Sequence, residues 1–342
     1  LSSGFNPNGN GVLFNHVFKP FIAKYTSDGD LIWVRTLDHN PTGSNNSSSM
    51  FYGSRVVLDQ YNNIYFNGLL ASDENATPLD IDSNPDNAFY VNFPEPNRYY
   101  SAIMKLDVDG NFLYVKLLDP QLAYNQSVAA RASLSVFDDT MVYLFIHQIG
   151  GDGIDLNYES GDPVFVEESL YKEIAVLYDL QGNYLNHVVL DDYSDEMANV
   201  GYQWIIMRPT RPMVDPFGNI YTRSSFLRSA VSEDEYNRRE ILRKLSPDFE
   251  LQWSKTINGT YAQYYHTPPA EYHEASNSVF YSFFKGETGY FGALSDVDFS
   301  DFEGGDLIDF ESFGQVIMIL NPESAAIKHV KGFENAGFNS NY

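Results

Sequence analysis

The sequence predicts an all-β chain, and within that class a β-propeller of about five four-stranded antiparallel blades. Three observations carry this prediction: one hairpin recurs along the chain, a second hairpin alternates with it, and the composition suits sheets. Among the 342 residues are 25 Tyr and 25 Phe, and aromatic side chains fit the half-buried surface of a pleated sheet.

The first hairpin consists of an apolar strand, a turn with Asp, Gly, Asn or Pro, and a second strand that usually ends in an aromatic or aliphatic residue. Gly29, Gly110 and Gly182 supply the positive φ that a tight hairpin needs. Copies follow one another at intervals of about 70 to 80 residues, which is typical of a repeat architecture. The copies occupy residues 21–33, 102–114, 174–185, 241–253 and, in degenerate form, 316–327.

The second hairpin occupies residues 56–65 and 213–221, with weaker copies at 134–143 and 274–281. Two hairpins per repeat give four strands, the composition of a propeller blade. We expect the polar segment 233–240 to be an exposed excursion between strands. The predicted single propeller domain spans residues 1–342, with blades at about 52–118, 129–190, 204–257 and 270–333 and an N-terminal half blade at 5–37.

The half blade lacks a partner hairpin, and residues 334–342 are too few to supply one. A closed ring leaves few unpaired strand edges, so propellers usually complete such a blade. We therefore expect the natural polypeptide to extend beyond one or both ends of this sequence.

The hairpins at 21–33 and 102–114 end in an aromatic residue, Trp33 and Tyr114. Short segments with Asp or Asn at alternate positions occur at 80–82, 155–157 and 296–298. In these features the chain resembles the repeats of secreted β-propeller proteins from the surface of Bacteroidota. The closing Trp of that family is kept only at Trp33 and Trp253. The resemblance implies an extracellular, cell-surface or periplasmic protein. It also implies export by the type 9 pathway or membership of an outer-membrane complex such as that secretion machinery.

The charge balance excludes several partners. With 46 acidic and 21 basic residues the formal net charge is −25, which disfavours nucleic acid and anionic membrane surfaces. The absence of cysteine excludes disulfides, thiolate metal sites and thiol nucleophiles. No apolar run reaches the roughly 18 residues of a membrane-spanning helix, so we expect a chain that does not span the membrane.

One constellation suggests a cation site. Asp80, Asp82, Asn84 and Asp86 place oxygen ligands at alternate positions, the ligand type that Ca²⁺ takes in a loop. The glycine of an EF-hand is missing, however, because Pro85 stands between them. The alternative is a polar loop whose short side chains bond their own backbone. For the similar segment 107–111, the hairpin context favours turn chemistry over a cation.

A second candidate is a binding loop. Tyr264, Tyr265, His266, Tyr272 and His273 surround a stretch with two prolines and no strand pattern, and functional residues favour such connections on a rigid scaffold. These side chains would contact a peptide or a sugar. The alternative is that the rings pack between blades.

No reaction motif is present: neither a Gly-x-Ser-x-Gly elbow nor a Walker or Rossmann fingerprint occurs. The sequence therefore favours a non-catalytic module that presents loops to a protein partner at the cell envelope, as an adhesin, scaffold or complex subunit. Two alternatives stay open. They are a glycan-binding propeller and a hydrolase or lyase that acts over the central channel with distant carboxylates.

Overall fold

A computed structural model describes residues 3–4, 13–14, 21–36, 56–82, 88–118, 132–148, 153–158, 161–167, 171–192, 206–229, 236–261, 270–285, 293–298, 301–302 and 314–334. These residues form β-strands and a single 3₁₀ turn, η2 (Glu274–Ser276). The prediction of an all-β chain with four-stranded antiparallel sheets is confirmed. None of the described residues forms a helix long and apolar enough to cross a bilayer.

Four successive segments each form an antiparallel meander of four strands, called here unit 1 to unit 4. Unit 1 contains β5 (Val57–Leu58), β6 (Ile64–Ala71), β9 (Tyr99–Leu106) and β10 (Phe112–Leu117). Unit 2 contains β11 (Ser133–Phe137), β12 (Thr140–Gln148), β15 (Tyr171–Asp179) and β16 (Tyr184–Asp192). Unit 3 contains β18 (Met213–Val214), β19 (Ile220–Ser229), β20 (Tyr236–Leu245) and β21 (Leu251–Tyr261). Unit 4 contains β22 (Glu271–His273), β23 (Ser278–Lys285), β25 (Gly314–Leu320) and β26 (Ile327–Glu334).

The remaining strands precede or interrupt these units. A half unit of two strands comprises β3 (Phe21–Tyr25) and β4 (Leu31–Thr36), and β1 (Ser3–Gly4) pairs with β2 (Leu13–Phe14). Short hairpins stand between the second and third strands of units 1 and 2: β7 (Leu79–Asp80) with β8 (Tyr90–Val91), and β13 (Ile154–Asp155) with β14 (Phe165–Val166). In unit 4 the corresponding strand β24 (Ala293–Asp298) pairs with β21, and β17 (Ile206–Pro209) pairs with β19. Units 3 and 4 thereby share one ten-stranded sheet.

The register places both turns of a unit at the same end. In unit 1, Leu58, Ile64, Leu106 and Phe112 form one row of cross-strand partners, and both turns lie just beyond it. The corresponding rows are Val136, Met141, Tyr178 and Tyr184; Val214, Ile220, Leu245 and Leu251; and Tyr272, Val279, Leu320 and Ile327. We call this end of the units the turn end. The short hairpins leave from the opposite end.

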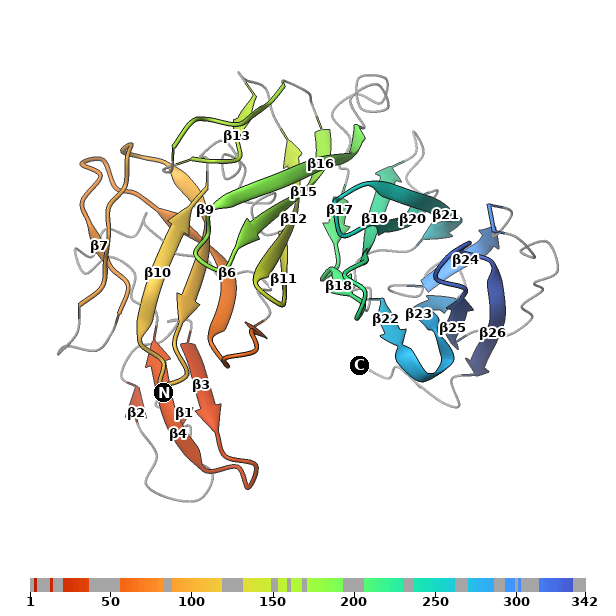
Figure 1. The fold of residues 1–342 in the computed structure, drawn as a ribbon, viewed down its shortest axis with the longest axis horizontal. Coiled ribbons are helices and arrows are strands. Elements are labelled where there is room, and N and C mark those ends of the chain that lie inside the picture. The colour runs from red at the N-terminus through yellow and green to blue at the C-terminus, as the bar shows by residue number, and fades with distance from the viewer. Residues whose placement is uncertain are drawn as a thin grey trace.

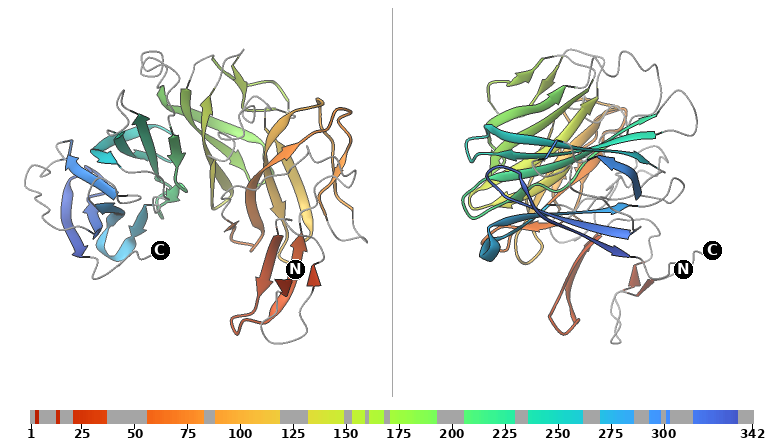
Figure 2. Two further views of the ribbon diagram at one scale, coloured as in Figure 1. Left: turned by 180° about the vertical axis from the view of Figure 1, so that it is seen from behind. Right: turned by 90° about the vertical axis from the view of Figure 1, so that its right-hand side faces the viewer.

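The core lies between the sheets, which pack face to face. Four apolar clusters each join consecutive parts of the chain: the half unit to unit 1, then units 1 to 2, 2 to 3 and 3 to 4. The first strands also contact in order, β5 with β11, β11 with β18 and β18 with β22. Figures 1 and 2 show the units following one another along an arc from the red half unit to the blue unit 4. Within the described residues the sheets do not close into a ring.

The expectation of an exposed excursion over 233–240 is wrong for its second half. Residues 236–240 begin strand β20, and Glu240 is fully buried. Glu240 is paired there with the buried guanidinium of Arg223, at 2.9 Å between Nε and Oε2. Glu240 therefore lies in the core with its charge compensated by Arg223 of the neighbouring strand β19.

Candidate functional site

The lysine of the repeated hairpin connects one unit to the turn of the next. Lys24 Nζ donates to the carbonyl of Val108 at 2.9 Å, and Lys105 Nζ donates to the carbonyl of Leu180 at 3.1 Å. Each acceptor lies in the second turn of the following unit. Burial lowers the pKa of Lys105, while Asp59 and Asp179 favour its charged form.

The closing residue of the hairpin also donates a hydrogen bond to the turn of the next unit, as the lysine does. Trp33 Nε1 donates to the carbonyl of Val108 at 3.3 Å, and Trp253 Nε1 donates to the carbonyl of Pro322 at 3.0 Å. Asn186, which replaces the aromatic in unit 2, donates to the turn of unit 3 through Nδ2. The lysine and closing residue together form what we call the inter-unit latch, so these motif residues serve assembly of the sheets.

Two of the turns that receive the latch, and the first turns of units 1 and 3, are each built around one carboxylate. Asp107 Oδ1 accepts from the backbone N–H groups of Asp109 and Asn111, and Oδ2 accepts from Asn111 Nδ2, each at 2.9 Å. Asp59, Asp179 and Asp215 make the same set of bonds in their own turns. The preference for turn chemistry at 107–111 is confirmed by these bonds.

These hydrogen bonds predict acid sensitivity. Burial raises the pKa of Asp107, but the bonds from Asn111, Asp109 and Gly110 together outweigh it and leave the pKa below its usual value. A lowered folded pKa contributes stability that is complete above the unfolded pKa of about 3.9 and is lost as pH falls through the folded pKa.

We therefore expect Asp107→Asn to melt below the wild type at pH 7, and the difference to shrink as pH falls toward 3. Thermal melts from pH 7 to pH 3 measure this. Asp109→Asn is the control, because the side chain of Asp109 is exposed in the same turn. A difference for Asp107→Asn that is constant over this range would contradict the assignment.

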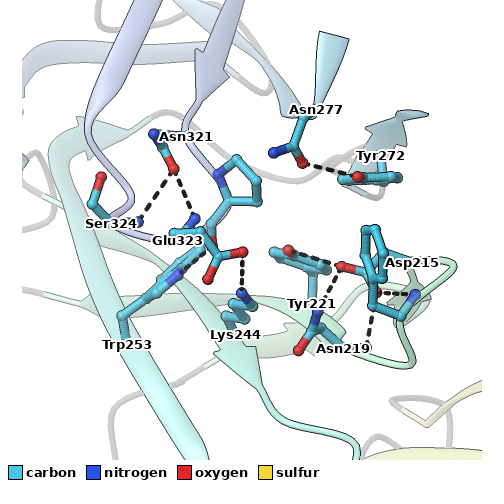
Figure 3. A network of polar contacts seen from close by, with 12 residues as sticks. Asp215, Asn219, Tyr221, Lys244, Trp253, Tyr272, Asn277, Asn321, Glu323 and Ser324 are labelled. Carbon is cyan, nitrogen blue, oxygen red and sulfur yellow. Dashed lines mark hydrogen bonds and ion pairs between the residues drawn. The ribbon is translucent and has the colours of Figure 1, made fainter. Parts of the chain in front are cut away.

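A network of polar side chains lies at the junction of units 3 and 4 (Figure 3). Tyr221 donates to Asp215 at 3.2 Å, and Lys244 Nζ contacts Glu323 Oε1 at 3.1 Å and lies 5.9 Å from the Tyr221 ring centre. Burial, with Asp215 beside it, raises the pKa of Tyr221 far above its usual value.

The same arrangement occurs at the junction of units 1 and 2. Tyr65 donates to Asp59 at 3.0 Å, and Lys105 Nζ lies 5.0 Å from the Tyr65 ring centre. A group that recurs at the same repeat position in two junctions belongs to the repeat architecture. Its lysine at the junction of units 1 and 2, Lys105, also donates to the turn of the next unit, so the group contributes to the packing of the sheets.

A buried charge network at units 2 and 3 was missed by sequence reasoning. Arg243 contacts Glu173 and Asp191, each at 2.9 Å, and Ser224 Oγ donates to Glu173. The side chains of Arg243 and Glu173 are completely enclosed. Alignment of the repeats could have revealed this network, because units 1 and 4 carry methionine where unit 3 has Arg243.

The four proposed calcium ligands are only partly described. Asp80 Oδ1 accepts from the backbone N–H of Asp82 at 3.2 Å and of Phe89 at 2.9 Å. Asp155 makes the equivalent bonds in unit 2. Asn84 and Asp86 lie outside the described residues. In the described ranges no group of three or more acidic or histidine side chains is arranged to hold a metal ion, and the calcium site stays a prediction.

The proposed binding loop is also described in part, because Tyr264, Tyr265 and His266 lie outside the described residues. Tyr272 and His273 belong to β22, at the turn end of unit 4. The Tyr272 hydroxyl donates to Asn277 at 2.9 Å, and His273 Nδ1 lies 2.9 Å from Ser276 Oγ. Both side chains therefore have partners within their own turn.

Two exposed aromatics at the turn end were not predicted. Tyr61 and Phe217 occupy the same position in the first turns of units 1 and 3, and 65% and 71% of their surfaces are exposed. The first turn of unit 2 lies between them. Gln60 donates to Asp139 at 3.2 Å, and an added Cβ on Gly218 would lie 3.8 Å from Phe137. The first turns of units 1 to 3 thus form one continuous surface, called here the inner turn surface.

Comparison of the chain with models of known protein families and with curated proteins finds no match.

Proposed function

We propose that the chain forms a β-propeller that acts as a non-catalytic protein-interaction module on the outside of a bacterial cell envelope. The propeller is supported by face-to-face packing of consecutive four-stranded units and by first strands that follow one another along the inside of the arc. The envelope location rests on the resemblance of the hairpins to secreted propeller repeats.

The far face of unit 4 supports continuation of the ring. Residues 316–320 are all apolar, yet burial alternates there, and Ile317 and Ile319 are only half-buried. The equivalent residues 241–245 of unit 3 are buried on both faces. A strand that is apolar on both faces is typical of a sheet covered on both sides, so we infer a further sheet over this face.

The interaction role rests on one observation: Tyr61 and Phe217 recur at the same repeat position and are exposed. Tyrosine and other aromatic side chains dominate many protein interfaces, because they bury a large area at small entropic cost. Turns on a rigid scaffold are the usual place for such residues. A non-catalytic role is supported by the repeated structural use of the Asp–Tyr–Lys group at two junctions.

The test is capture of a partner by the tagged protein from the cells that make it, followed by size exclusion with mass measurement. We expect a stoichiometric partner for the wild type and its loss in Tyr61→Ser/Phe217→Ser. The matched control is Tyr90→Ser/Phe165→Ser. These two aromatic residues occupy equivalent positions in the short hairpins of units 1 and 2, and each is 62% exposed. Equal capture by both double variants, or a wild type that elutes alone, would contradict the proposal.

A further inference from the structure

The turns at the turn end carry acidic residues of their own, and basic side chains reach them only from the flanking strands. The turns at residues 26–30, 59–63, 107–111, 137–140, 179–183, 215–219, 246–250, 274–277 and 321–325 contain no Lys or Arg. Their exposed acidic side chains are Asp28, Asp30, Asp109, Asp138, Asp139, Asp248, Glu250, Glu274 and Glu323. Together with the carboxylates that build the turns, these side chains outnumber the basic groups that reach the turns, so the potential at this end is negative.

Apolar side chains lie within this negative surface. Tyr61 and Phe217 project from the inner turn surface, and Val56 and Leu58 are exposed beside the first of them, on and before strand β5. Asp138 and Asp139 occupy the turn between the two aromatics. A ligand that spans this surface therefore meets an aromatic, a pair of carboxylates and a second aromatic in succession.

We propose that the inner turn surface binds a cationic polypeptide segment, in which Lys or Arg side chains alternate with apolar ones. This inference rests on the proposed interaction function and names the chemistry of its partner. The cationic groups pair with Asp138 and Asp139, and the apolar residues pack on Tyr61 and Phe217. Lys and Arg also stack over aromatic faces, so the rings contribute to recognition of charge as well.

The energetics favour association by many weak contacts. A single exposed ion pair contributes little, because water and salt screen it, so no carboxylate alone determines affinity. The summed field accelerates association and makes it sensitive to salt, because exposed charges are screened beyond about 10 Å at 0.1 M. The apolar contacts are less sensitive to salt and set the position of the ligand.

The probe is a fluorescein-labelled peptide of alternating Lys and Leu, with a Glu-and-Leu peptide as its charge-reversed counterpart, followed by fluorescence anisotropy. We expect the wild type to bind the Lys peptide and not the Glu peptide, with affinity that falls as salt rises. Tyr61→Ser/Phe217→Ser and Asp138→Asn/Asp139→Asn are each expected to weaken binding at least tenfold.

Two control variants separate this site from general attraction to an acidic protein. Tyr90→Ser/Phe165→Ser removes the same number of exposed rings, and Asp162→Asn/Glu167→Gln removes the same charge from the short hairpin of unit 2. Both should bind as the wild type does. Equal weakening by test and control variants, or binding of the Glu peptide, would overturn the inference.

The outcome is separable from that of the proposed function. Capture of a neutral or acidic partner that depends on Tyr61 and Phe217 would retain the interaction function and overturn the cationic ligand. Failure to capture any partner would overturn the function itself.

Discussion

Replacing Arg243 with methionine is expected to lower the free energy of unfolding by about 3–5 kcal/mol, the cost of breaking a buried ion pair from one side. Arg243 contacts Glu173 and Asp191 across the junction of units 2 and 3. Its removal takes a cationic partner from the enclosed carboxylate of Glu173, which also accepts from Ser224 Oγ. Urea denaturation followed by far-ultraviolet circular dichroism measures the loss.

The double variant Arg243→Met/Glu173→Gln should recover most of that loss. Units 1 and 4 carry Met104 and Met318 at the position of Arg243, and unit 4 carries Gln315 at the position of Glu173. Methionine and glutamine therefore each occur at the equivalent repeat position of unit 4, where they belong to one strand, β25. A double variant as unstable as the single one would contradict the assignment of the loss to an uncompensated carboxylate.

Gly110→Ala is expected to destabilise the protein by about 2–5 kcal/mol, the sum of a positive-φ penalty and overpacking. Gly110 has a φ of +82°, and an added Cβ would lie 3.0 Å from the Trp33 ring. The methyl group therefore strains the turn and pushes away the closing tryptophan of the half unit.

Gly29→Ala isolates the backbone part of this effect. Gly29 has a φ of +88°, and nothing lies within 4 Å of an added Cβ. We expect a loss of about 1–2 kcal/mol from the left-handed conformation alone. Thermal melts monitored by tryptophan fluorescence compare the two variants. Equal losses would show that Trp33 does not lie over the turn of unit 1.

Local structure was predictable because its causes are local. Gly29, Gly110 and Gly182 have positive φ as the hairpin pattern predicts, and the four-stranded units follow from two hairpins per repeat. The contacts of the latch were not predictable, because Lys24 and Lys105 reach acceptors 84 and 75 residues away. Composition and periodicity contain no information about which turn a lysine meets.

Charge misled the sequence analysis at Glu240, because a polar run is usually solvent-exposed and the compensating Arg223 lies in another strand. Comparison of equivalent repeat positions would have found Arg243, which replaces an apolar residue. The same comparison would have found Tyr61 and Phe217. They were missed because rings in a propeller were expected to pack between sheets, and nothing local distinguishes a ring at a turn tip from one in the core.

Site-specific photo-cross-linking tests the central claim most directly. A benzophenone amino acid replaces Phe217 in the inner turn surface or, in a separate protein, Phe165 in the short hairpin of unit 2. Both positions are exposed, so neither substitution disturbs the core. We expect irradiation in intact cells to link the benzophenone at position 217, and not the one at position 165, to one protein with a basic segment at the cross-linked site. Cross-links from position 165 alone, or from neither position, would contradict the claim.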